Sequence, residues 1–109
     1  MSETLMINTV TLVGRVGQDP EMKYFESGKV KTSLSMAVNR PVKGDKTDWF
    51  KIELWDRSAE IAGEYVRKGS LIGIIGTLEF NHWTDKEGNK VVTPYINAQD
   101  LRLLGKKEG

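Results

Sequence analysis

The stretch TDWFKIELWDRSAEIAGEYVRKGS, residues 47–70, has the pattern of a strand followed by the pattern of a helix. Side chains of a strand alternate between its two faces. One face of this strand is apolar and consists of Phe50, Ile52 and Leu54. The other face carries Trp49, Lys51, Glu53 and Trp55. Because the apolar face suffices for a core, the two tryptophans need a different explanation.

The second half of the stretch predicts a helix over residues 58–68. Ser58 is a favoured N-cap residue. An apolar stripe with helical spacing follows at Ile61, Ala62, Tyr65 and Val66. Arg67 and Lys68 complement the helix dipole, and Gly69 is expected to take the left-handed conformation that ends many helices.

Strand patterns flank this unit on both sides. The predicted strands cover residues 7–17, 30–38, 48–55, 71–83 and 91–104, with a short strand and turn over 22–29 in the first connection. Three strands, a helix and two strands is the order of the OB-fold. We therefore predict an all-β protein, a five-stranded OB-fold barrel with one α-helix between strands three and four. An open α+β sheet is the alternative.

Length and composition restrict the class of protein. The chain has 109 residues, which suits one domain over residues 1–105 with a short polar tail over 106–109. It has no cysteine, which excludes disulfides and cysteine-based metal or thiol sites. Neither a membrane-length apolar run nor a signal-peptide pattern is present, so we expect a soluble cytoplasmic protein, with an organellar mature form left open.

The third tryptophan repeats the pattern of the first two. Trp83 shares its strand face with Glu79 and Asn81 and lies opposite Phe80. Three tryptophans outside the core suit either a subunit interface or a surface on which the bases of a single-stranded nucleic acid stack. A net charge of +1 means that any such site depends on where its cations lie.

Cations do lie close to the tryptophans. Lys51 lies between the first two on the same face, and Arg57 follows their strand closely. Arg40 lies in the preceding loop, and Arg15 lies on the first strand. These side chains are candidate phosphate contacts.

Catalysis has little support in the sequence. His82 is the only histidine, and the chain contains no GxSxG, P-loop or HExxH motif. We therefore predict a protein that is not an enzyme and has no cofactor and no metal site.

Three segments together resemble the bacterial-type single-stranded-DNA-binding proteins. They are VTLVGRVGQDPEMKY, TDWFKIELWDRSAEIAGEYVRKGS and HWTDKEGN, within a match from about residue 7 to residue 104. The resemblance implies an OB-fold homotetramer that binds single-stranded DNA without sequence preference in replication, recombination and repair. It implies nucleoid association and no membrane partner.

The resemblance also implies roles for particular residues. The stacking positions of the family match Trp49, Trp55 and Trp83. Its basic positions near DNA match Lys51, Arg57, Lys23 and Lys68. Its subunit contacts match Ile7, Thr9, Thr11 and Val13 on the first strand, and also Phe50.

The sequence departs from the family pattern in three places. NRPVKGD offers Arg40 where relatives often carry another stacking tryptophan, and Glu79 and Asn81 stand where relatives often carry basic residues. The sequence ends at GKKEG, without the family's acidic tip, so we do not expect recruitment of repair or replication proteins through such a tip. A primosome or recombination mediator and an RNA-binding module remain the alternative functions.

Overall fold

The computed structural model describes residues 5–42, 44 and 46–105. Within these residues the elements are β1 (Val10–Val16), β2 (Glu21–Tyr24), β3 (Val30–Asn39), β4 (Thr47–Trp55), α1 (Asp56–Tyr65), β5 (Leu71–Thr84) and β6 (Lys90–Gly105). The prediction of a β protein with one helix before its last two strands is confirmed. The strand count of five is wrong, because the short segment β2 pairs with β3 and forms a sixth strand. The prediction of a polar tail over 106–109 lies outside the described residues.

All six strands belong to one sheet, in the order β1-β5-β6-β4-β3-β2. Neighbouring strands are antiparallel except β4 and β6, which run parallel. β1 also pairs with β3, where Arg15 lies opposite Ala37 and Val16 lies opposite Met36. The pairings therefore lead from β1 through β5, β6, β4 and β3 back to β1, with β2 added at the outer edge of β3.

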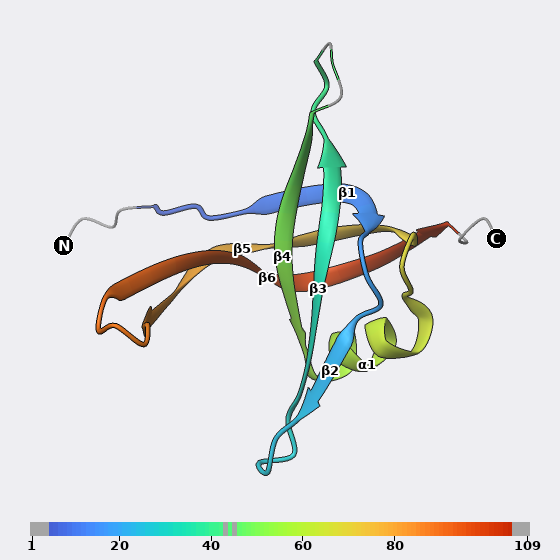
Figure 1. Ribbon diagram of the computed structural model, residues 1–109. Coiled ribbons are helices and arrows are strands. Elements are labelled where there is room, and N and C mark those ends of the chain that lie inside the picture. Colours follow the sequence, from blue (N-terminus) through green and yellow to red (C-terminus); the bar gives the residue numbers. More distant parts are fainter. Residues whose placement is uncertain (1–4, 43, 45, 106–109) are drawn as a thin grey trace.

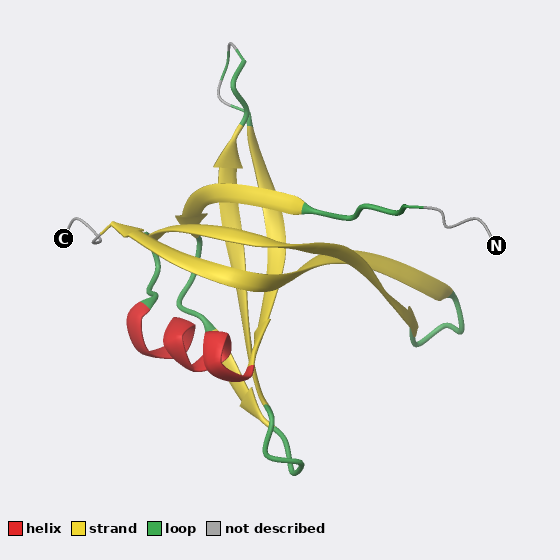
Figure 2. Cartoon of the chain, turned by 180° about the vertical axis from the view of Figure 1, so that it is seen from behind, coloured by secondary structure: helices red, strands yellow, loops and turns green. Residues whose placement is uncertain are grey.

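The two long hairpins cross each other at a steep angle (Figure 1). β3 and β4 run along one direction, and β5 and β6 run across them. The outer half of the β5–β6 hairpin projects past the rest of the sheet, and we call its residues 79–95 the arm. Seen from behind, α1 lies near one end of the β3–β4 hairpin (Figure 2), where it packs against β3 and β4.

The core is built from the inward faces of the strands and from one face of α1. On β3 buried and partly exposed side chains alternate, and its buried residues are Val30, Thr32, Leu34 and Met36. The largest buried apolar side chains from the other strands are Ile52, Leu54, Ile72, Ile74 and Ile96. Burying one such side chain stabilises the fold by about 1.5–3 kcal/mol. The core therefore needs neither Trp49 nor Trp83.

Both ends of the helix differ from the prediction. α1 begins directly after Trp55 instead of at Ser58, and Asp56 takes a positive φ of 53°, which aspartate tolerates better than most residues. It ends at Tyr65 because Val66 turns into extended backbone, where its side chain is fully buried in the core. Gly69 has the expected positive φ of 90°, but it serves the turn before β5 and does not cap the helix.

A buried hydrogen bond fixes α1 relative to the sheet. The hydroxyl of Thr32 on β3 donates to the carbonyl oxygen of Ala59 at 2.7 Å, and both residues are fully buried. The bond satisfies a hydroxyl that would otherwise be costly to bury. The start of α1, and with it the end of β4 at Trp55, is thereby held against β3.

The first strand is shorter than predicted at its N-terminal end. β1 begins at Val10, and the preceding Asn8 pairs with β5 through its side chain. The amide group of Asn8 accepts from the backbone N–H of Leu78 at 3.0 Å and donates to its carbonyl oxygen at 2.9 Å. One side chain thus replaces a backbone rung next to β1.

Candidate nucleic-acid interface

The outward face of β4 lies beside a row of small side chains on β3. In register, the facing pairs are Trp49–Ala37, Lys51–Ser35, Glu53–Ser33 and Trp55–Lys31. The small neighbours of Trp49 and Lys51 leave their larger side chains standing above the sheet. Trp49 is 62% exposed, which is a large apolar exposure for a residue that the core does not need.

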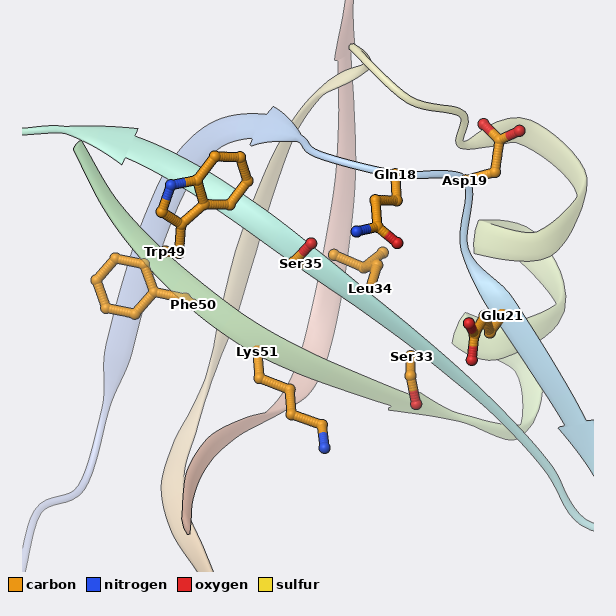
Figure 3. A pocket seen from close by; sticks show the side chains of 9 residues that line it. All are labelled: Gln18, Asp19, Glu21, Ser33, Leu34, Ser35, Trp49, Phe50 and Lys51. Atoms are coloured by element: carbon orange, nitrogen blue, oxygen red, sulfur yellow. The ribbon is translucent and has the colours of Figure 1, made fainter.

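A hollow of about 390 Å³ lies beside Trp49. In Figure 3, Trp49 stands at one end, Asp19 and Glu21 stand at the other, and Ser33 and Ser35 lie between them. The middle of the hollow therefore carries small side chains, its lining is mostly apolar, and one end is an aromatic ring. Such a hollow can accept a planar ring, while its acidic end disfavours a phosphate.

Gly17 makes room for the ring of Trp49. A Cβ atom at this position would collide with carbon atoms of the indole ring. The backbone of the segment after β1 therefore lies directly against the indole, which limits the orientations that the ring can take.

A second hollow, of about 480 Å³, joins β4 to the arm. Lys51, Asn81, His82, Trp83 and Thr93 line it. Lys51 also lines the first hollow, so its side chain borders both of them. Trp83 is 50% exposed, and its indole Nε1–H donates to the hydroxyl of Thr93 at 2.9 Å, which fixes the ring on the arm.

Trp55 differs from the other two tryptophans because its ring has an aromatic partner. It is half-buried and stacks on Phe25, with ring centroids 5.5 Å apart and planes inclined by 25°. Lys31 lies 5.8 Å from the centroid of Trp55, and Lys23 lies 5.1 Å from that of Phe25. The family resemblance predicted Lys23 and Trp55, whereas no pattern in the sequence pointed to Phe25 or Lys31 as members of this group.

Glu53 lies on the outward face, as the alternation predicts, yet it is only 6% exposed. Its carboxylate lies 3.8 Å from the ammonium group of Lys31 on the neighbouring strand. This ion pair separates the Trp49 end of β4 from the Trp55 end. A phosphate passing over the middle of the strand would meet a carboxylate there.

A second carboxylate is held within a polar network at the base of the arm. Glu79 accepts hydrogen bonds from the hydroxyl of Thr77 at 2.7 Å, from that of Tyr95 at 2.8 Å and from the amide of Asn97 at 3.2 Å. These bonds, that of Thr77 foremost, hold the pKa of Glu79 below its usual range. The bond to Glu79, followed by burial and the nearby negative charge, raises the pKa of Tyr95 to about 12.

We expect Glu79→Gln to make stability less dependent on acid pH. The folded-state pKa of Glu79 is lowered, so its ionised form stabilises the protein above the usual carboxyl pKa, and this contribution is lost as pH falls through the folded-state value. The variant should therefore be less stable than the wild type at neutral pH, and the difference should narrow in acid. Urea unfolding from about pH 6 to about pH 3 measures this difference.

The matched control for this experiment is Glu64→Gln, an exposed glutamate on α1. Its difference from the wild type should stay small throughout the range. A constant gap between Glu79→Gln and the wild type across the same range would contradict the role assigned to the network.

Four of the predicted cations lie apart both from the two hollows and from the Trp55–Phe25 pair. Arg40, at the end of the β3–β4 hairpin, donates from Nε and Nη2 to the carboxylate of Asp48 at 2.9 and 3.0 Å, which lowers the pKa of Asp48. Arg15 donates to the carbonyl oxygen of Gly69 at 3.1 Å. The other two are exposed: Arg57 on α1 beside Glu60, and Lys68 in the turn that follows.

The predicted subunit contacts fall into two groups. The residues from the segment before β1 and from β1 itself form an exposed strip, which consists of Ile7, Thr9, Thr11 and Val13. Phe50 lies on the inward face of β4, is half-buried and packs against the core.

Two further findings concern only the residues that the structure describes. Over residues 5–42, 44 and 46–105, no group of three or more histidine, cysteine or acidic side chains is placed to hold a metal ion. No helix in this part of the chain has the length and apolar character needed to cross a membrane.

Exposed indoles on a sheet, with a lysine between them, form the kind of surface on which unpaired bases stack. A model of the single-strand binding protein family matches residues 7–104. This chain belongs to the single-strand binding protein family, as the resemblance predicted. Its members are binding proteins and not enzymes.

Relatives match nearly the whole chain. Single-stranded DNA-binding protein 1 of Nostoc sp. is 59% identical over 105 residues, which cover 95% of this chain and 88% of that protein. Single-stranded DNA-binding protein 1 of Synechocystis sp. is 51% identical over 106 residues, covering 94% and 88%. The single-stranded DNA-binding protein of Thermosynechococcus vestitus is 50% identical over 102 residues, covering 93% and 85%.

Proposed function

We propose that this chain binds single-stranded DNA without sequence preference and coats and protects it during replication, recombination and repair. The observation that carries the proposal is the pair of exposed indoles, Trp49 and Trp83, whose hollows share Lys51. The names of the relatives support the choice of DNA as the nucleic acid.

The mechanism follows from the chemistry of the two hollows. Every base has a π-face, so an indole can stack on any of them, and each stacked base contributes about 1–3 kcal/mol. Lys51 supplies a cation for the phosphate that links bases stacked on Trp49 and Trp83. Stacking of this kind does not read base edges, so it gives affinity with little sequence preference.

The strand pairings support an OB-fold barrel for this sheet. β1, β3, β4, β5 and β6 each pair with two others of the set, and β2 is then an addition at the edge of β3. In OB-folds the face of the barrel around the second and third strands binds oligonucleotides. The corresponding strands are β3 and β4, which carry the Trp49 hollow.

Tetramers are the norm in this family. The exposed strip from Ile7 to Val13 suits an interface between copies of the chain, because an open strand edge and exposed apolar side chains call for a partner. DNA as the ligand suits a location at the nucleoid in the cytoplasm.

The test is a titration with a long oligothymidylate at low and at high salt, followed by intrinsic tryptophan fluorescence. Bases stacked on the indoles should quench the emission, and affinity should fall with salt because phosphate contacts release counterions. Lys51→Gln should weaken binding and reduce the slope of log K against log salt by about 0.7. If the folded protein showed no quenching, the tryptophans would be better explained as part of an interface with another protein.

Arg102→Gln provides the matched loss of one positive charge. Arg102 is an exposed residue of β6 that pairs with Asp100 at 2.9 Å, away from both hollows. Its salt slope should equal that of the wild type.

A comparison with RNA tests the choice of DNA. A stronger affinity for an RNA oligomer of matched length would overturn this choice.

A further inference from the structure

The indole of Trp55 is held by the protein in a way that the other two are not. Phe25, in the turn after β2, stacks on it at a centroid distance of 5.5 Å. That turn is closed by two backbone bonds, from Phe25 N–H to the carbonyl oxygen of Lys29 and from Gly28 N–H to that of Phe25, both at 2.9 Å. Phe25 therefore comes from a backbone of defined shape and not from a loose loop.

Two lysines accompany this pair of rings. Lys23 on β2 and Lys31 on β3 lie directly opposite each other in the register of the sheet. Their ammonium groups lie 5.1 Å from the centroid of Phe25 and 5.8 Å from that of Trp55, within the range of cation–π attraction. Rings and cations thus gather at one corner of the sheet, where the end of β4 meets the hairpin formed by β2 and β3.

This corner is separate from the hollows at Trp49 and Trp83. Trp55 lies six residues beyond Trp49 on one strand, which corresponds to about 20 Å at about 3.3 Å per residue. The buried carboxylate of Glu53 lies between them and is paired with Lys31. A single strand of DNA that contacts both ends of β4 must therefore cross the middle of β4, where no ring is available for stacking.

We infer that Phe25 is a positioning residue, which holds Trp55 as the platform of a separate stacking subsite whose phosphate is met by Lys23 and Lys31. The inference rests on the proposed function, because it concerns a further contact with the same single-stranded DNA. A stacked aromatic pair is favourable beyond its buried area. Holding the indole in one orientation before the ligand arrives reduces the entropy that binding would otherwise cost.

The experiment compares Phe25→Leu, Phe25→Tyr and Tyr24→Leu in titrations with a long oligothymidylate. Phe25→Leu should weaken binding by about three- to tenfold, the range of an aromatic pair, with no change in salt slope because no charge is removed. Phe25→Tyr keeps the ring and should bind like the wild type. Tyr24→Leu removes an adjacent aromatic residue that is 72% exposed and stacks on no ring among the described residues, so it should also bind like the wild type.

A double variant tests whether Phe25 acts through Trp55. In the background of Trp55→Ala, the change Phe25→Leu should have no further effect on affinity, because the ring that it positions is gone. An equal loss in both backgrounds would overturn the positioning role. So would wild-type affinity of the single variant, whatever its melting temperature.

The outcomes separate this inference from the proposed function. If wild-type protein fails to bind oligothymidylate, the proposed function fails and the subsite fails with it. If wild-type protein binds and responds to Lys51→Gln, while Phe25→Leu leaves affinity unchanged, the inference alone is wrong. Circular dichroism of each variant shows that a loss of affinity comes from folded protein.

Discussion

Replacing Trp49 and Trp83 together by alanine is expected to weaken binding to a long oligothymidylate by about thirtyfold or more. Each ring contributes about 1–3 kcal/mol when a base stacks on it, and every ~1.4 kcal/mol changes affinity tenfold. Both rings are at least half exposed and lie outside the core, so the double variant should fold normally. The slope of log K against log salt should match that of the wild type. Neither substitution removes a charge, so the release of counterions from the phosphates is unchanged. Titrations at two or more salt concentrations measure both quantities.

The control for the tryptophan pair is Tyr65→Ala. Tyr65 is an exposed aromatic residue on α1 and lines neither of the two hollows. We expect its affinity to stay within about twofold of the wild type. If the double tryptophan variant also stayed within that range, the indoles would not be the platform on which the proposal depends.

Ile52→Ala should cost about 2–5 kcal/mol of unfolding free energy. Ile52 is fully buried, and it lies opposite Leu34 on one side and Ile96 on the other, where three strands meet. Truncation removes apolar contacts and leaves a cavity at a position where neighbouring backbones cannot close in. Since domains of this size are stable by only about 5–15 kcal/mol, a large fraction of the total would be lost. Urea denaturation followed by circular dichroism measures it.

Val92→Ala is the surface comparison for Ile52→Ala. Val92 is a β-branched side chain on the arm and is 53% exposed. Its removal should change the unfolding free energy by no more than about 0.5 kcal/mol. Losses of equal size from the two variants would mean that the core does not lie between β3, β4 and β6.

The alternation along β4 made it possible to predict which of its side chains face outward and which face the core. A period of two assigns faces without knowledge of any partner strand, so Trp49 and Lys51 could be placed outside and Ile52 inside from the sequence alone. The burial of Glu53 could not be predicted in this way. It depends on Lys31, which lies on another strand and two residues out of direct register, so only the pairing of β3 with β4 reveals it.

Phe25 and the end of α1 show the other limit. Phe25 lies in a turn, where no periodicity restricts the direction of a side chain, and its partner Trp55 is thirty residues away. Val66 continues the helical stripe in the sequence. In the structure its side chain is buried in the core and its backbone is extended, so the helix ends earlier than predicted. In both cases tertiary packing decided the outcome. The assignment of individual residues to DNA contact stays a prediction.

The parallel pairing of β4 with β6 is short, and this matters for how the molecule opens. Two pairs define it, Ile52 with Ile96 and Glu53 with Asn97, whereas β5 and β6 pair along almost their whole lengths. Short pairings separate more readily than long ones in local fluctuations of the native state. Lys51 lies on the β4 side of this pairing and Trp83 lies on the β6 side. A bound DNA strand that contacts both residues would therefore keep β4 and β6 paired. The ligand would then stabilise the pairing of β4 with β6 reversibly, and hydrogen exchange of the backbone amides along this pairing would slow when DNA is present.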